Sequence, residues 1–78
     1  SNLTATFHRA FACYFTGWGI EKNTHKGFFL FKKCAERGHF AGMAYCAMLW
    51  KYSQDKRQAS FWAEKALSSN DPLAIGIC

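Results

Sequence analysis

The sequence lacks any long run of apolar residues. Its longest apolar stretches, residues 27–31 and 40–50, are well short of the roughly 20 residues that are needed to span a bilayer. The chain also has no charged leader followed by an apolar core near its first residue, which is the pattern of a secretory signal peptide. We therefore expect neither a membrane span nor a signal peptide in these 78 residues.

Metal-binding patterns are absent as well. The four cysteines are Cys13, Cys34, Cys46 and Cys78. No two of them form a CxxC pair, the spacing by which structural zinc sites are recognised. Cys34 and His39 are a close Cys and His couple, but two ligands do not complete a tetrahedral site. The sequence therefore predicts no metal and no cofactor, and the cysteines are interpreted as buried thiols that pack as small hydrophobes.

Groups for nucleophilic or acid–base catalysis are scarce too. Cys34 and His39 are again the pair considered as a nucleophile and its base. They lie five positions apart across an expected helix end, with Gly38 between them, so we expect the two side chains to point in different directions. The sequence thus predicts a protein that is not an enzyme.

The composition favours one folded domain over residues 1–78. Half of the residues are hydrophobic and 18% are aromatic, which is sufficient for a packed core. Ten Lys and Arg residues against five acids give a net charge of +5, but no run of basic residues exceeds two. This scatter favours a solvated surface, so nucleic acid is not the expected partner. A basic surface that binds nucleic acid or anionic phospholipid is the alternative.

The periodicity of apolar residues predicts an all-α fold. Apolar residues recur at spacings of three and four in segments that predict helices over about 4–16, 24–37 and 40–52. A fourth helix is predicted to start at Ser53 or Asp55 and to run to about Ser68. Gly17, Gly19 and Gly38 are suited to end helices, and either Asn23 or Thr24 can cap the second one. Pro72 suits the first position of a fifth helix. We expect this helix to continue into a further unit, and a short capping helix is the alternative.

The second half of the sequence partly repeats the first. Cys34 aligns with Ala66 and Gly38 with Asn70 at an offset of 32 residues, and Ala41 aligns with Ala74 at 33. This period is typical of solenoids, in which each helical hairpin buries its apolar face against its neighbours. The prediction is about two repeats and the start of a third, over residues 6–40, 41–73 and 74–78.

Two segments resemble the Sel-one-like repeat family of the tetratricopeptide-like superfamily: YFTGWGI (14–20) and KCAERGHFA (33–41). The second unit keeps Trp62, Lys65 and Ala66 in the family order but lacks the GxG, and Gly27 replaces the usual Ala. The resemblance implies an alpha-alpha superhelix, a right-handed solenoid of antiparallel helix hairpins. It also implies a scaffold or adaptor function in protein–protein interaction.

Cysteine spacing separates this chain from one branch of that family. In the branch, cysteines eight residues apart join adjacent helices, whereas the residue eight positions after Cys34 is Gly42. The resemblance therefore does not extend to a disulfide-stapled protein, and a reducing, intracellular compartment is favoured.

The first helix of each stacked hairpin would line a concave surface that binds a peptide or helix. Two rows of residues fall outside the expected core stripes: His8, Ala12 and Phe15, and then Phe40, Met43, Ala47 and Trp50. Phe15 and Trp50 are favoured for partner contact, with Arg9 and Lys51 as charged neighbours. For Phe40 and Met43 we favour packing in the core. A segment that only extends a larger solenoid is a third interpretation.

Overall fold

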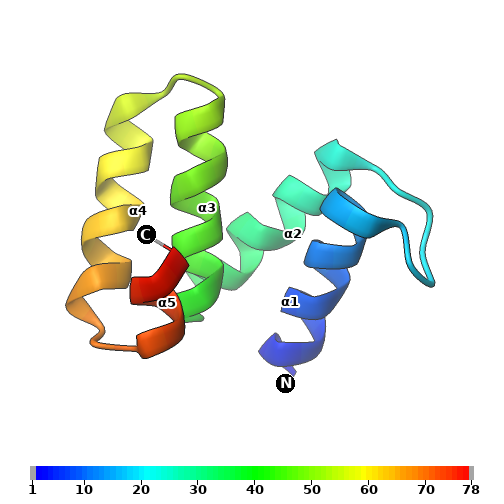
Figure 1. Ribbon diagram of the computed structural model, residues 1–78, viewed down its shortest axis with the longest axis horizontal. Coiled ribbons are helices and arrows are strands. Elements are labelled where there is room, and N and C mark those ends of the chain that lie inside the picture. Colours follow the sequence, from blue (N-terminus) through cyan, green and yellow to red (C-terminus); the bar gives the residue numbers. More distant parts are fainter. Residues whose placement is uncertain (1, 78) are drawn as a thin grey trace.

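The computed structural model describes residues 2–77. Cys78, the last position of the expected third repeat, therefore lies outside the described residues. Within this range the chain is all-helical, as the sequence predicts, and it contains no strand. Five α-helices and one π-helical turn follow one another (Figure 1): α1 (Leu3–Phe11), η1 (Ala12–Thr16), α2 (Thr24–Glu36), α3 (Phe40–Tyr52), α4 (Lys56–Ser68) and α5 (Pro72–Ile77).

The first four α-helices each begin with a side chain that accepts a backbone N–H from the first turn: Asn2, Asn23, His39 and Asp55. Asn23 accepts from the Lys26 N–H at 3.0 Å and Asp55 from the Gln58 N–H at 3.1 Å. Each such cap contributes about 1 kcal/mol. In the structure Asn23, and not Thr24, caps α2, and Thr24 is the first helical residue.

The first helix changes its winding before it ends. The sequence predicts a regular helix to about residue 16, and the chain is helical to Thr16, but its last five residues form the π-helical turn η1. Gly17 then adopts φ +75°, a left-handed conformation that favours glycine. Gly38, with φ +92°, ends α2 in the same way.

Aromatic side chains form much of the core where α1, η1, α2 and α3 meet. Phe31 is fully buried and stacks on Tyr45, with ring centroids 5.1 Å apart and planes inclined by 13°. Phe7, Phe11 and Phe15 lie along one side of the first helix and all have ring centroids within 5.9 Å of that of Tyr45. These contacts join the first helix directly to the third.

A second core cluster consists mainly of small side chains: Ala35, Met43, Ala44, Cys46, Ala66 and Ala74. It joins the end of α2 to α3, α4 and α5. Close approach of the helices depends on glycine at two points, because a Cβ at Gly27 would lie 2.6 Å from the Tyr14 Cβ and one at Gly42 would lie 2.7 Å from the Cys34 Cβ. Helix packing is therefore tight at Gly27 and Gly42.

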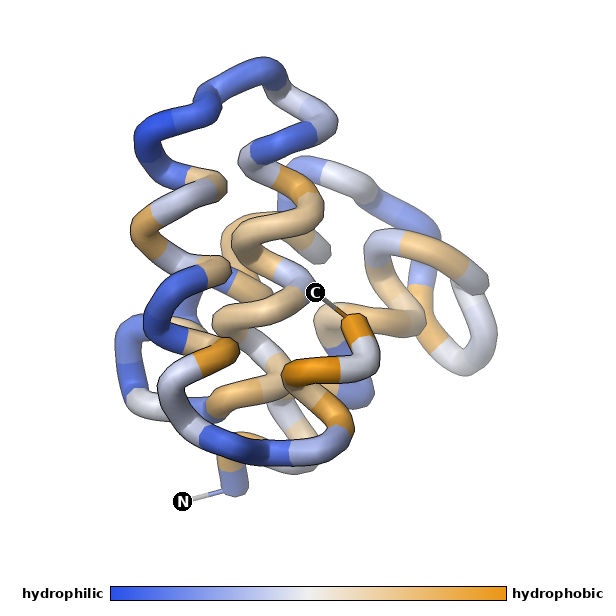
Figure 2. The backbone as a smooth tube through the Cα atoms, turned by 60° about the vertical axis from the view of Figure 1, so that its left-hand side comes forward, coloured by the Kyte–Doolittle hydropathy of each residue, from blue (hydrophilic) through white to orange (hydrophobic). Residues whose placement is uncertain are grey.

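Consecutive helices pack against one another: α1 and η1 on α2, α2 on α3, and α3 on α4. The helices α3 and α4 run side by side in opposite directions, and α5 lies against both near the lower end of the pair (Figure 1). The chain is hydrophobic around α5 and hydrophilic at the turn that joins α3 to α4 (Figure 2). The two ends of the α3–α4 pair therefore differ in polarity.

Candidate partner-binding groove

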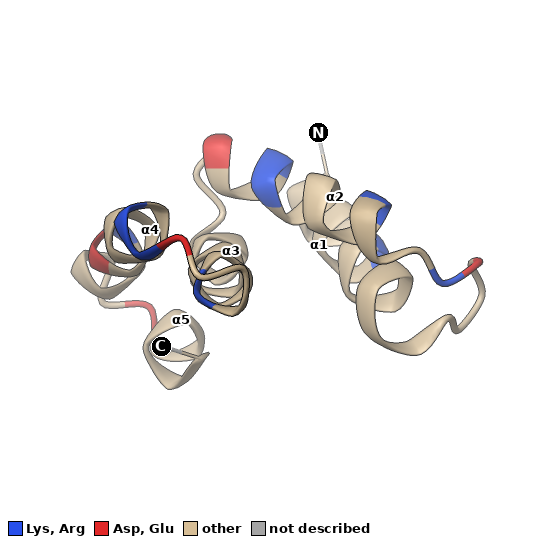
Figure 3. Ribbon diagram, turned by 90° about the horizontal axis from the view of Figure 1, so that it is seen from above, with Lys and Arg blue, Asp and Glu red and all other residues tan. Residues whose placement is uncertain are grey.

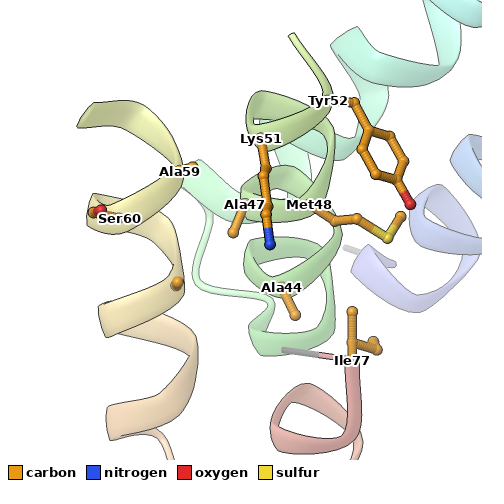
Figure 4. Close-up of a pocket in the computed structure, with 9 residues that line it drawn as sticks. Ala44, Ala47, Met48, Lys51, Tyr52, Ala59, Ser60 and Ile77 are labelled. Atoms are coloured by element: carbon orange, nitrogen blue, oxygen red, sulfur yellow. The ribbon is translucent and has the colours of Figure 1, made fainter. Parts of the chain in front are cut away.

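A groove of about 460 Å³ lies between α3 and α4 (Figure 4). One wall comes from α3 through Ala44, Ala47, Met48, Lys51 and Tyr52. The other wall comes from α4 through Ala59, Ser60 and Ala63. At its lower end the groove is bordered by Ile77 of α5. Three helices thus contribute to one open depression.

The groove is hollow because four of the residues that line it are alanines: Ala44, Ala47, Ala59 and Ala63. Their short side chains leave the space between the two helices unfilled above Ile77. Met48 is also half-buried against the aromatic core, so the groove floor is continuous with the packed interior. The walls are therefore fixed by the fold, and the surface is available without rearrangement of the core.

Cations lie in and beside the groove. Figure 4 shows the Lys51 ammonium group directed into it beside Ala47. An adjoining depression near the α3–α4 turn shares Lys51 and Ala59 and adds Gln54 and Lys56. No Asp or Glu among the described residues lines either depression. The surface is thus apolar near α5 and positively charged toward the turn.

The structure does not bring the six predicted contact residues together. Of these six, only Lys51 lines the groove. His8 and Arg9 are exposed on α1. Phe15 is half-buried, and its ring packs against those of Phe11 and Tyr14 at centroid distances of 4.9 and 4.7 Å.

The remaining two candidates lie on α3 but face away from the groove lining. Met43 is only 7% exposed and packs in the second core cluster, the alternative that the sequence favoured for it. Trp50 is half-buried, and the centroid of its ring lies 5.1 Å from that of Phe28. Phe40, by contrast, is 43% exposed although the sequence favoured core packing for it.

Sequence reasoning missed the α4 wall of the groove. Of the residues that line the groove, only Ala47 and Lys51 were placed outside the core from the sequence, and Ala59, Ala63 and Ile77 were not considered for binding. The available signal was the spacing of Ala59 and Ala63, four positions apart on one face of a helix. A pair of small residues at this spacing marks a helix face that a neighbour can approach closely.

The thiols do not form an activated site in the described part of the chain. Cys13, Cys34 and Cys46 are free and fully buried. Burial raises the pKa of the Cys34 thiol, an effect that the Arg37 charge opposes, and burial raises the pKa of Cys46 to about 12. Both shifts disfavour the thiolate, the reactive form. The Nδ1 atom of His39 accepts the Gly42 N–H at 3.0 Å and so is engaged in capping α3.

The described residues contain neither a cluster of metal-binding side chains nor a membrane-spanning helix. Within residues 2–77, no three His, Cys, Asp or Glu side chains gather as a metal site would require. None of the described helices combines the length and the hydropathy that crossing a membrane demands. Comparison with known proteins gives no match to any family model, curated protein or solved structure.

Proposed function

We propose that this chain is a non-catalytic protein-interaction module that binds an α-helical segment of another protein in the groove between α3 and α4. The observation that carries the proposal is the open, alanine-lined groove of about 460 Å³. This volume falls within the range of about 300–1,000 Å³ that is common for ligand pockets. The lining offers few polar groups to orient a small polar ligand, so a mainly apolar occupant is favoured.

A helix suits the groove better than an extended peptide. The two walls are helices that run in opposite directions, and their alanines allow close approach of a third helical backbone. The same pair of helices already accommodates α5, whose Ala74 is fully buried against them. An amphipathic helix that lays its apolar side chains between α3 and α4 would extend this mode of packing.

The proposal includes the solenoid architecture that the Sel-one-like resemblance implies. Two features support it. Successive hairpins adjoin, with α3 close against α2 at Gly42. The first helix of one hairpin also contacts the first helix of the next, because Phe7 and Phe11 pack on Tyr45. In such an arrangement the chain would act as part of a scaffold or adaptor.

The basic residues give less support to the alternative partners, nucleic acid and anionic phospholipid. Lys and Arg are distributed over several helices and do not gather on one of them (Figure 3). A salt titration distinguishes the two classes of partner. Binding in an apolar groove should depend weakly on salt, whereas contacts to many phosphates would cause a steep loss of affinity between low and physiological salt.

The test is a selection of displayed helical peptides on the wild-type protein, with counter-selection on Ala63→Phe. The new ring would fill the groove from the α4 wall, so selected peptides should bind this variant about tenfold more weakly or worse. Ala59→Phe fills the same groove from a second position. The matched control is Ala5→Phe, which places an identical ring on an exposed site of α1. Circular dichroism establishes that all three variants fold.

Amide chemical shifts then locate the bound peptide. Shifts concentrated in residues 44–52 and 59–63 would support the groove. The proposal is wrong if the selected peptides bind Ala63→Phe and Ala59→Phe as tightly as the wild type. Shifts centred on Phe15 and Trp50 would instead support the surface that the sequence predicts.

A further inference from the structure

The groove differs in character from one end to the other. Its lower end is bordered by Ile77 and Ala44, which are apolar. Toward the α3–α4 turn, the depression is lined by Lys51 and Lys56. Asp55 in the same turn accepts the Gln58 N–H and does not line the depression among the described residues. An occupant of the whole groove would therefore meet hydrophobic surface at one end and two cations at the other.

The groove also continues an existing helix interface. The helix α5 packs on α3 and α4 through Ala74, and Ile77 at its end borders the groove. Figure 4 shows Ile77 below Ala44, Met48 and Lys51 of α3. A helix placed in line with α5 would prolong the same contact surface. The part of α3 between Ala44 and Lys51 corresponds to two turns, or about 10 Å of helix.

Helix polarity determines which way such an occupant would run. The C-terminal end of a helix carries a partial negative charge, and each cation near it improves affinity by about twofold to fivefold. The N-terminal end carries the opposite charge and would be disfavoured beside Lys51 and Lys56. The two lysines therefore select one of the two orientations in the groove.

From these observations we infer that the partner helix lies parallel to α3, in line with α5, and presents its C-terminal end with an acidic side chain to Lys51 and Lys56. This inference rests on the proposed function, since it concerns the occupant of the same groove. The partner is thus a helix from another protein, with large apolar residues on one face and Asp or Glu in its last turn. The apolar residues would fill the space that the groove alanines leave.

The probe is a synthetic, lactam-stapled helix of three turns with leucines along one face and two Glu residues in its last turn. A second peptide has Gln in place of both Glu residues. Fluorescence anisotropy should show that the Glu peptide binds the wild-type protein about fivefold to tenfold more tightly than the Gln peptide. The difference should disappear in the double variant Lys51→Gln, Lys56→Gln.

The matched control is Lys22→Gln, Lys26→Gln, which removes the same charge from exposed positions at the start of α2. This control should keep the preference for the Glu peptide. Direction is measured separately with a nitroxide label on the peptide. A label at the N-terminal end should broaden the amide signals of Ala44 and Ile77, and a label at the C-terminal end should broaden that of Gln54.

The outcomes separate the inference from the function on which it rests. If both peptides bind equally well, or if the labels give the reverse pattern, the inferred orientation and charge are wrong, while sensitivity to Ala63→Phe would preserve the groove as a binding site. If neither peptide binds at millimolar concentration, both proposals fail. If sedimentation velocity shows self-association that Ala63→Phe abolishes, the occupant is a second copy of the chain, and the inference is overturned.

Discussion

Cys13 and Asn23 are joined by two hydrogen bonds: the Asn23 N–H donates to the Cys13 carbonyl oxygen at 2.8 Å, and the Cys13 thiol donates to the Asn23 carbonyl oxygen at 3.3 Å. In a regular α-helix the Cys13 carbonyl would accept from the Gly17 N–H. Here the Gly17 N–H donates instead to the Ala12 carbonyl at 2.6 Å, five residues back. The contact between Cys13 and Asn23 therefore accompanies both the π-helical turn and the start of α2.

Cys13→Ala should lower the free energy of unfolding by about 1–3 kcal/mol, because it removes a thiol donor and leaves a small cavity at a fully buried position. Cys13→Ser should lose less, since a hydroxyl group retains a donor. Urea denaturation followed by circular dichroism measures both changes. A midpoint for Cys13→Ala equal to that of the wild type would show that the thiol contributes nothing to the joint between these helices.

The helix boundaries could be predicted from the sequence because their signals are local. Asn23 caps α2, Gly38 ends it, and Pro72 opens α5, as expected from the chemistry of each residue. The π-helical turn could not be predicted in this way. It depends on a contact between Cys13 and Asn23, ten positions apart, that forms only when the loop folds back onto the helix.

The site was harder to predict, because α3 is apolar on almost every side. Residues 41–44 are all buried in succession, so spacing alone does not show which face meets which neighbour. Trp50 illustrates the consequence: the sequence did not show that its ring packs against Phe28 of α2. The groove depends on the faces that α2, α4 and α5 leave uncovered, and that is a property of the assembled fold.

Gly42→Ala should destabilise the protein by about 1–3 kcal/mol, because the added methyl group would come within 2.7 Å of the Cys34 Cβ and force α2 and α3 apart. Gly27→Ala should cost at least as much, since its methyl group would meet the Tyr14 backbone nitrogen at 2.7 Å, and backbone moves less readily than a side chain. Thermal or urea unfolding measures both effects.

The matched control for these substitutions is Gly76→Ala in α5. A Cβ at Gly76 meets nothing within 4 Å, and its φ is not positive. Because alanine favours a helix over glycine, this variant should be as stable as the wild type or up to about 1 kcal/mol more stable. Equal losses in all three variants would contradict the assignment of Gly27 and Gly42 to close helix contacts.

Phe31→Ala and Phe29→Ala should differ sharply although the two residues lie on the same helix. Phe31 is fully buried and stacked on Tyr45, so its truncation should cost about 3–5 kcal/mol, a large part of the stability of a domain of this size. Phe29 is 58% exposed, and its truncation should change stability by no more than about 0.5 kcal/mol. Chemical denaturation measures both changes. Similar losses of stability in the two variants would contradict the described orientation of α2.

The pH dependence of stability should have a contribution from His39. Its Nδ1 caps α3 by accepting the Gly42 N–H at 3.0 Å, which requires that nitrogen to be unprotonated. Burial lowers the pKa of His39 below its ordinary value of 6.5, Asp71 opposes this shift, and His8 adds to it. The unfolded chain therefore binds a proton more readily than the folded one. The stabilising contribution is complete above pH 6.5 and is lost as the pH falls from there through the lowered pKa.

His39→Asn should remove this part of the pH dependence while it keeps a capping acceptor at the start of α3. At neutral pH the variant should be nearly as stable as the wild type, and between neutral pH and about pH 5 it should lose less stability. The matched control is His25→Asn, at an exposed site in the first turn of α2, which should retain the wild-type dependence. Urea denaturation across this range measures the slopes. If the free energy of unfolding varies with pH in the same way for His39→Asn and the wild type, proton binding at His39 is not coupled to folding. Removal of a cap that titrates must change this slope.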